Sequence, residues 1–223
     1  MVAYGVGYVP EWFLWIACII FILFIGITYW LTRGKVETTA KGNGEIGNKA
    51  FYTENPILAM TKRVEIFDMK TNYVGYVKRG FDNPFQMLTT MFLPNYFVDL
   101  YGEDANGNLK IKIHKLREKK DLLQNRWEVQ IISKNCEENF MIKGDKKLLS
   151  SKVLSFPYKN EIINVSKNVS ERTINFHKNG QQISYISSNG KLPPRDIFMD
   201  TQDGELPFLL LACIYEVIKF YRT

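Results

Sequence analysis

The chain has 223 residues, of which 46% are hydrophobic and 14% aromatic, and this composition excludes the disordered class. Its formal net charge of +6 favours anionic surfaces weakly without identifying a partner. Cys18, Cys136 and Cys213 are scattered along the chain, which predicts no disulfide framework and favours a reducing compartment.

The first strong feature in chain order is an uncharged apolar run near the start. Trp12 to Leu31 comprises 20 residues without a charge, and about 20 apolar residues suffice for a helix to cross the hydrocarbon core of a bilayer. Trp12 lies at its beginning and Tyr29 and Trp30 near its end, where interfacial aromatic residues are enriched. We therefore expect a transmembrane helix over residues 12–32 that attaches the protein to a membrane through Trp12–Leu31.

The charges around this run predict its orientation. Residues 1–11 contain no Lys or Arg, whereas basic residues follow the run from Arg33 onward. By the positive-inside rule, residues 1–11 are extracytoplasmic and residues 33–223 cytoplasmic, as in a single-pass protein of the cell membrane. A cleaved signal peptide is the alternative, but it would need a basic residue before a shorter apolar run.

A polar stretch separates this run from the rest of the chain. Residues 33–50 are rich in Gly, Thr, Lys and Asn and offer little to pack. The composition predicts a flexible tether, for which a length of this kind gives an r.m.s. reach of about 21–25 Å. Residues 51–223 then form the folded domain, although the pattern of Phe51–Met60 is ambiguous. The tether would keep that domain within reach of lipid headgroups.

The folded region begins with a long series of short strands joined by turns. Apolar runs of strand length alternate with turn-forming residues, and two Asn-Gly pairs are strong hairpin signals. The clearest strands are Val64–Asp68, Tyr73–Arg79, Tyr96–Tyr101, Leu109–His114, Trp127–Ile132, Asn139–Lys143, Thr173–His177 and Gln182–Ile186, and further strands are possible within Lys147–Phe156 and Glu161–Val165. In this interpretation five of the eight prolines fall between hairpins, where they interrupt no ladder: Pro84, Pro94, Pro157, Pro193 and Pro194.

The end of the chain predicts a buried helix. Leu206–Tyr221 has no charged residue before Glu216 and is apolar on every side, as expected of a helix in a protein interior. It is too short to cross a bilayer, which takes about 20 residues. The fold we expect is therefore mainly β, an antiparallel β-barrel of hairpins wrapped around this C-terminal α-helix. A two-sheet sandwich is the alternative, but it leaves the apolar helix without an obvious place.

Three of these features together resemble the tubby C-terminal-like superfamily, which includes the phospholipid scramblases and the LURP-one-related proteins. They are the strand–turn–strand unit of Val64–Lys78, the late strand leading into the acidic turn of Ile197–Glu205, and the closing apolar helix. Members of this superfamily wrap a β-barrel around such a helix, and the resemblance implies a role connected with lipids. The N-terminal position of the membrane segment departs from the scramblases, in which that segment is placed at the C-terminus.

No catalytic, metal-binding or cofactor-binding motif stands out. The chain has no GxSxG elbow or Walker loop, and the glycines Gly42, Gly44 and Gly47 lie in the predicted tether and not between a strand and a helix, as a dinucleotide-binding GxGxxG motif requires. His114 and His177 fall in predicted strands without metal-ligand spacing. Acidic residues such as Asp203 and Glu205 are better explained by helix capping than by acid–base chemistry. We expect no catalytic residue, no metal and no cofactor.

Basic residues form the one surface to which the sequence gives a possible binding role. Alternation along Leu109–His114 places Lys110 and Lys112 on the face opposite the apolar residues. Further basic residues follow directly, so that the predicted lipid-binding set is Lys110, Lys112, Lys115, Arg117, Lys119 and Lys120. Each Lys or Arg close to anionic headgroups contributes about 1 kcal/mol. The alternative is an ordinary solvated outer face.

These inferences predict a membrane-anchored, noncatalytic binding module at the inner membrane surface, which binds anionic lipid headgroups or a protein partner. A lipid-handling protein of scramblase type and an enzyme with an unrecognised site are the alternatives. Nucleic acid is not an expected partner, because the basic residues are not interleaved with exposed aromatic residues and no recognition helix is present.

Overall fold

The computed structural model describes residues 2–4, 7–33, 48–54, 62–81, 83–92, 98–116, 125–134, 136–144, 152–168, 170–189, 195–202 and 204–221. The chain divides into two compact units, Met1–Thr39 and Ala40–Thr223. Each unit is described by itself.

The N-terminal unit contains a short hairpin and one helix. Strands β1 (Val2–Tyr4) and β2 (Gly7–Val9) pair antiparallel, and α1 runs over Glu11–Arg33. The hairpin was not predicted, whereas α1 coincides with the helix expected over residues 12–32. Within the part of the chain that the structure describes, no helix combines the length and the apolarity needed to cross a membrane.

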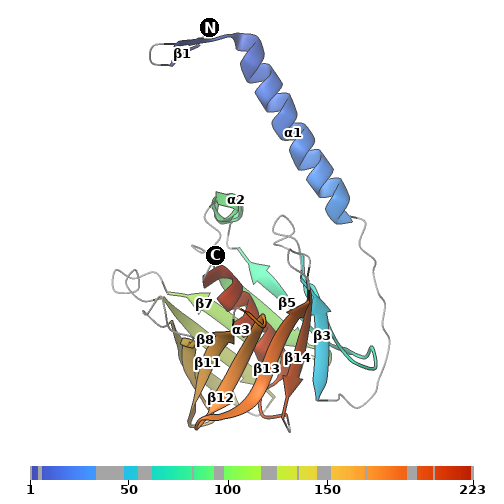
Figure 1. The fold of residues 1–223 in the computed structure, drawn as a ribbon, viewed down its shortest axis with the longest axis vertical. Helices are drawn as coiled ribbons and strands as arrows, with labels where there is room; N and C mark the ends of the chain where they lie inside the picture. The colour runs from blue at the N-terminus through green and yellow to red at the C-terminus, as the bar shows by residue number, and fades with distance from the viewer. Residues whose placement is uncertain are drawn as a thin grey trace. The chain divides into compact units, whose positions relative to one another are not determined.

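The second unit is a closed barrel of twelve antiparallel strands (Figure 1). The strands are β3 (Lys49–Thr53), β4 (Val64–Asp68), β5 (Tyr73–Gly80), β6 (Asp99–Asp104), β7 (Leu109–Lys115), β8 (Arg126–Ser133), β9 (Glu137–Gly144), β10 (Lys152–Tyr158), β11 (Glu161–Asn168), β12 (Thr173–Lys178), β13 (Gln181–Asn189) and β14 (Asp196–Thr201). Each strand pairs with its neighbours in the sequence, and β3 pairs with β14 to close the ring. Closure leaves no sheet edge exposed.

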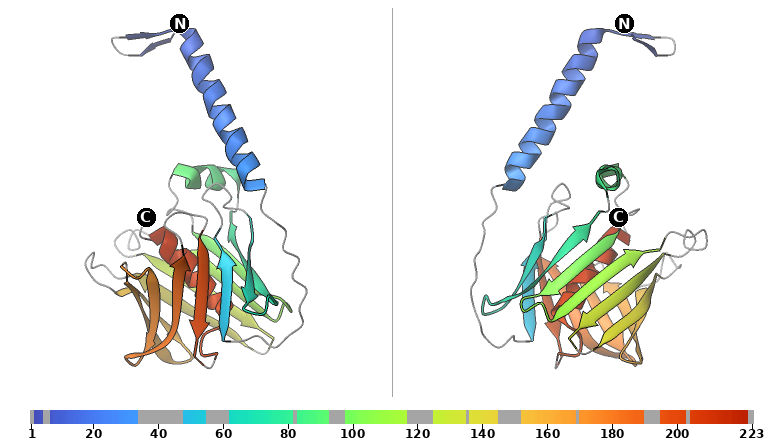
Figure 2. Two further views of the ribbon diagram at one scale, coloured as in Figure 1. Left: turned by 45° about the vertical axis from the view of Figure 1, so that its right-hand side comes forward. Right: turned by 180° about the vertical axis from the view of Figure 1, so that it is seen from behind.

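Helix α3 (Phe208–Tyr221) fills the interior of the ring (Figures 1 and 2). It contacts β5, β6, β7 and β14, and the side chains of Leu210, Leu211 and Ile214 are fully buried. A Cβ at Gly102 of β6 would lie 3.0 Å from Leu209 Cδ1 and 3.1 Å from Cys213 Sγ. The absence of a side chain at Gly102 therefore lets the wall approach the helix closely. The predicted barrel around a C-terminal helix is confirmed.

The alternation of apolar and polar residues along the strands explains why the barrel wall has one side toward the core and one side toward solvent. In β7, Ile111 and Ile113 are buried while Lys112 and His114, which alternate with them, are exposed. This period-two pattern directs apolar side chains toward α3 and polar ones toward solvent. The other strands whose burial is described follow the same alternation with local irregularities, and one continuous apolar core results.

Because neighbouring strands are antiparallel, successive connections alternate between the two ends of the barrel, and the connections differ in length between these ends. Five hairpins turn at one end over short segments, 69–72, 105–108, 134–136, 159–160 and 179–180. The connections at the opposite end are mostly longer and include residues 54–63, 81–98, 116–125, 145–151 and 190–195. We refer to these as the short-turn end and the long-connection end. Because α3 starts after the segment 202–207 at the short-turn end, its C-terminus lies at the long-connection end (Figure 1).

Helix α2 (Pro84–Phe92), in the connection from β5 to β6, was not predicted. Asn83 caps it, since its Oδ1 accepts a hydrogen bond from the backbone N of Gln86 at 2.8 Å. Pro84 occupies the first helical position, where its missing N–H costs nothing. Strand β6 accordingly starts at Asp99, later than predicted.

The expectation that Pro157 lies between hairpins is wrong. This residue lies within β10 and pairs with Ile162 of β11, next to the hairpin turn at Lys159 and Asn160. The pair beyond a two-residue turn is a non-hydrogen-bonded one, so the ring nitrogen of Pro157 faces away from β11. Because β9 pairs with β10 only around Leu154 and Ser155, no donor is required of Pro157.

Truncation of a side chain on α3 tests whether the helix is the core of the barrel. Replacement of the fully buried Leu210 by Ala should lower the free energy of unfolding by about 2–5 kcal/mol. Ile162→Ala is the matched control, because that side chain is 63% exposed on the wall and its loss should change stability by less than about 0.5 kcal/mol. Urea unfolding followed by circular dichroism measures both variants. Equal effects would show that α3 is peripheral.

Candidate functional site

The predicted basic strand lies on the outer wall formed by β5, β6 and β7. Register pairing places Lys110 opposite Glu103 and Lys112 opposite Tyr101 on β6. On the other side of β6, Tyr76 of β5 pairs with Glu103. The structure therefore brings lysines together with two tyrosines and one carboxylate. We call this group, with Lys78 added below, the β5–β7 face.

Glu103 is the centre of the polar contacts on this face. Its Oε2 accepts hydrogen bonds from the Tyr76 hydroxyl at 2.8 Å and the Tyr101 hydroxyl at 3.3 Å, and its Oε1 lies 3.2 Å from Lys110 Nζ. Hydrogen bonds from Tyr76 and Lys110 hold the pKa of Glu103 below its usual range. Burial, assisted by Glu103, raises the pKa of Tyr76 to about 12. Lys110 is therefore paired with Glu103 on the barrel wall.

Lys78 and Lys112 lie on either side of Tyr101. Lys78 Nζ is 5.2 Å from the centroid of the Tyr101 ring, a cation–π contact, and the backbone register aligns both lysines with this tyrosine. Both side chains are exposed. Lys78 was missing from the predicted set, although the alternation of β5 places it on the same side as Tyr76. An anion at this face would find two cations beside aromatic hydroxyl groups.

The remaining predicted residues contribute less to this face. Lys115 ends β7 half-buried, and its backbone N donates to Asp99 Oδ1 at 3.3 Å. The neighbouring His114 Nδ1 lies 2.7 Å from the same carboxylate oxygen. Arg117, Lys119 and Lys120 lie outside the described residues. The structure thus brings together Lys110 and Lys112 of the predicted six, and it adds Lys78.

A second polar cluster joins the closing strands to α3. The carboxylate of Glu54, just after β3, accepts hydrogen bonds from Arg195 Nε at 2.7 Å and Nη2 at 3.2 Å. Lys219 of α3 lies 2.5 Å from the other side of the group, at Oε1. The Glu54 side chain is fully buried. The residues before β14, after β3 and at the end of α3 therefore meet at one carboxylate.

Glu216 of α3 completes this cluster and lies one turn before Lys219. It accepts a hydrogen bond from the Tyr52 hydroxyl at 3.3 Å and lies 3.6 Å from Lys219. Burial raises the pKa of Glu216, whereas Lys219 acts in the opposite direction. Burial also lowers the pKa of Arg79 on β5 to about 10, partly offset by Glu216. The cluster fixes the position of the helix within the ring.

The two clusters differ in what they can do chemically. The β5–β7 face presents the exposed ammonium groups of Lys78 and Lys112 beside half-buried tyrosines, and these ammonium groups complement phosphate or carboxylate ligands by charge and hydrogen bonding. The Glu54 cluster satisfies its own charges and is buried. Among the residues that the structure describes, no group of three His, Cys, Asp or Glu side chains could hold a metal ion.

The sequence and the fold were compared with known proteins. The family described as "Tubby C-terminal like domain" matches residues 51–221. An Arabidopsis thaliana protein of known crystal structure resembles the chain with 12% sequence identity and a TM-score of 0.45, over 78% of this chain and 91% of that one. No curated protein matches the sequence.

Changing Glu54 tests the buried cluster. Glu54→Gln removes the carboxylate charge that Arg195 and Lys219 share, and breaking a buried pair costs about 3–5 kcal/mol. Glu216→Gln should cost less at neutral pH, because burial already disfavours its charged form. Urea unfolding of both variants gives the comparison. A greater loss of stability for Glu216→Gln would contradict the assigned roles.

The pH dependence of stability provides a second measurement on the same variants. Burial by itself raises the pKa of Glu54, but hydrogen bonds from Arg195 and the charge of Lys219 outweigh it and lower the pKa. Stabilisation by Glu54 is then complete above its unfolded pKa of about 4.3 and is lost as the pH falls through the lower folded pKa. Glu54→Gln should reduce this acid-induced loss of stability. An unchanged profile would show that Glu54 is not ionised in the fold.

Proposed function

Because the chain belongs to the Tubby C-terminal-like domain family, we propose that it is a membrane-anchored, noncatalytic binding module. In this proposal the barrel lies at the inner membrane surface and binds anionic lipid headgroups. Exposed Lys78 and Lys112 on either side of Tyr101 are the observation that carries the proposal.

The chemistry of the β5–β7 face favours a headgroup over a reaction. Phosphate oxygens accept charge-assisted hydrogen bonds from lysine, and the tyrosine rings offer an amphipathic surface of the kind enriched at membrane interfaces. Lys110 is held by Glu103, so its contribution to binding is smaller than the sequence suggested. The Tyr76 and Tyr101 hydroxyl groups donate to Glu103, so Lys78 and Lys112 are the groups on this face that would bind a headgroup.

Membrane attachment is the part of the proposal that rests on sequence. Trp12–Leu31 carries no charge and Arg33 follows it, which supports a single-pass anchor with the barrel in the cytoplasm. Attachment places the β5–β7 face near lipid continuously. A weak electrostatic contact would then act at high effective concentration.

A protein partner is the second candidate, favoured by the two tyrosines. Tyr76 and Tyr101 lie with ring centroids 6.2 Å apart on the wall, and tyrosine is enriched in protein interfaces. A partner of this kind would carry acidic residues opposite the lysines. Lipid movement of scramblase type is a further alternative, which transport of labelled lipid in proteoliposomes would reveal.

Vesicle flotation of the compact unit, residues 40–223, tests lipid binding without the predicted anchor. Lys78→Gln combined with Lys112→Gln should weaken co-flotation with phosphatidylserine-containing vesicles about thirtyfold, since each lysine contributes about 1 kcal/mol. Raising the salt concentration should weaken binding further, because the Debye length falls from about 10 Å at 0.1 M to 3 Å at 1 M.

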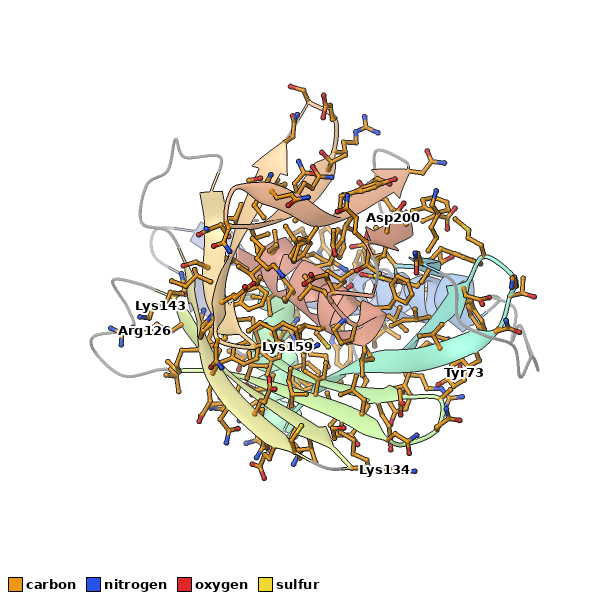
Figure 3. The ribbon with its side chains drawn as sticks, turned by 90° about the horizontal axis from the view of Figure 1, so that it is seen from below. Tyr73, Arg126, Lys134, Lys143, Lys159 and Asp200 are labelled. Carbon is orange, nitrogen blue, oxygen red and sulfur yellow. The ribbon has the colours of Figure 1, made fainter. Side chains whose placement is uncertain are left out.

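The matched control is Lys134→Gln combined with Lys159→Gln. These exposed lysines lie in the turns of the short-turn end (Figure 3), and their replacement changes the net charge equally. Binding by the control should stay close to that of the unmodified protein. Equal losses in the two double variants would show that net charge alone, and not the β5–β7 face, attracts the vesicles.

A further inference from the structure

Helix α2 buries polar side chains and exposes apolar ones. The polar side chains of Gln86 and Thr90, one turn apart, are buried at 9% and 0% exposure, while Phe85 is 72% and Met87 44% exposed. A surface helix normally buries its apolar side and exposes its polar side. In α2 the polar side faces the protein, and apolar groups face outward.

The sequence of the helix extends this pattern. Pro84–Phe92 contains no charged residue. An exposed apolar helix without charge is costly in water, so an apolar environment is expected to cover it.

The connections of the long-connection end, one of which contains α2, carry a net positive charge in sequence. The six connections of the long-connection end, 54–63, 81–98, 116–125, 145–151, 169–172 and 190–195, contain ten basic and six acidic residues, a net charge of +4. The segments of the short-turn end, with residues 202–207 included, contain three basic and two acidic residues, a net charge of +1. An apolar helix within a basic rim is complementary to an anionic bilayer surface.

The position of α2 is also continuous with the β5–β7 face. Lys78 lies two residues before the end of β5, and α2 starts four residues after that end. On β7, Lys112 is the middle residue of the strand, level with Lys78 across Tyr101 of β6. The lysines of the β5–β7 face and the apolar side of α2 could therefore contact the same membrane surface.

We propose that α2 inserts its exposed apolar side into the membrane interface, so that the long-connection end of the barrel faces the bilayer. This inference rests on the proposed membrane function and names the bilayer, not a second protein, as the cover of Phe85 and Met87. The polar side of α2 with Gln86 and Thr90 stays buried in the protein, and basic residues of the same barrel end contact anionic headgroups.

A fluorescent label on the full-length protein in phosphatidylcholine–phosphatidylserine vesicles tests this placement. Phe85→Cys carries the environment-sensitive label, in a background of Cys18→Ala and Cys136→Ser, and Cys213 is buried. Interfacial helices bury their apolar side about 5–10 Å into the headgroup–acyl boundary. Spin-labelled lipid should therefore remove most of the fluorescence at position 85.

Met69→Cys is the control, because Met69 is 54% exposed in a turn of the short-turn end. Its label should keep most of its fluorescence in the same vesicles. Equal quenching at positions 85 and 69, or none at 85, would overturn the proposed orientation. Shielding of position 85 that needs an added protein and not lipid would likewise overturn it.

Flotation of residues 40–223 distinguishes this failure from failure of the proposed function. If the unit binds anionic vesicles but position 85 stays unquenched, the barrel binds lipid in another orientation and only the role of α2 is wrong. If the unit does not bind and position 85 is unquenched, both proposals are wrong. Phe85→Asp, checked for native circular dichroism, should weaken binding if α2 inserts, and unchanged binding would contradict insertion.

Discussion

The structure depends on burying an apolar helix inside a ring that must close around it. α3 has apolar residues on every side, so one packing surface cannot satisfy it, whereas a closed wall can. Closure requires β3 and β14, at opposite ends of the domain sequence, to pair. Glu54 joins this seam to the helix through Arg195 and Lys219. The helix and the seam therefore stabilise each other.

Local sequence predicted most of this architecture because most of its pairings are local. Asn-Gly turns and alternating strands identify hairpins without reference to the rest of the chain, and the uncharged end identifies the core helix. Strand β3 was ambiguous because its partner β14 lies more than a hundred residues away. The contact between Glu54 and Arg195 spans 141 residues, and no local pattern announces it.

The errors at the candidate site have separate causes. The predicted strand ended at Tyr101, before Glu103, so nothing in the predicted pattern paired that carboxylate with Lys110. Lys78 could have been found from the alternation of β5. Helix α2 escaped prediction because its apolar residues face outward, which reverses the pattern used to recognise a surface helix.

The fold separates stability from binding. The Glu54 cluster and the apolar core hold the barrel from inside, and the tight turns complete one end of it. Exposed lysines, tyrosines and the apolar side of α2 are left to the wall and the opposite end. Substitutions on the binding surface should therefore be tolerated by the fold, a property expected where functional sites lie on loops and faces supported by a rigid scaffold.

Hydrogen–deuterium exchange of the full-length protein tests the account most directly, because it compares both ends of the barrel and the wall in one sample. Phosphatidylserine in the vesicles should slow exchange in α2 and in β5–β7, relative to phosphatidylcholine alone, while the turns at 134–136 and 159–160 exchange unchanged. Equal exchange in the two lipid compositions, or slowing confined to the short-turn end, would contradict a barrel whose long-connection end faces the membrane.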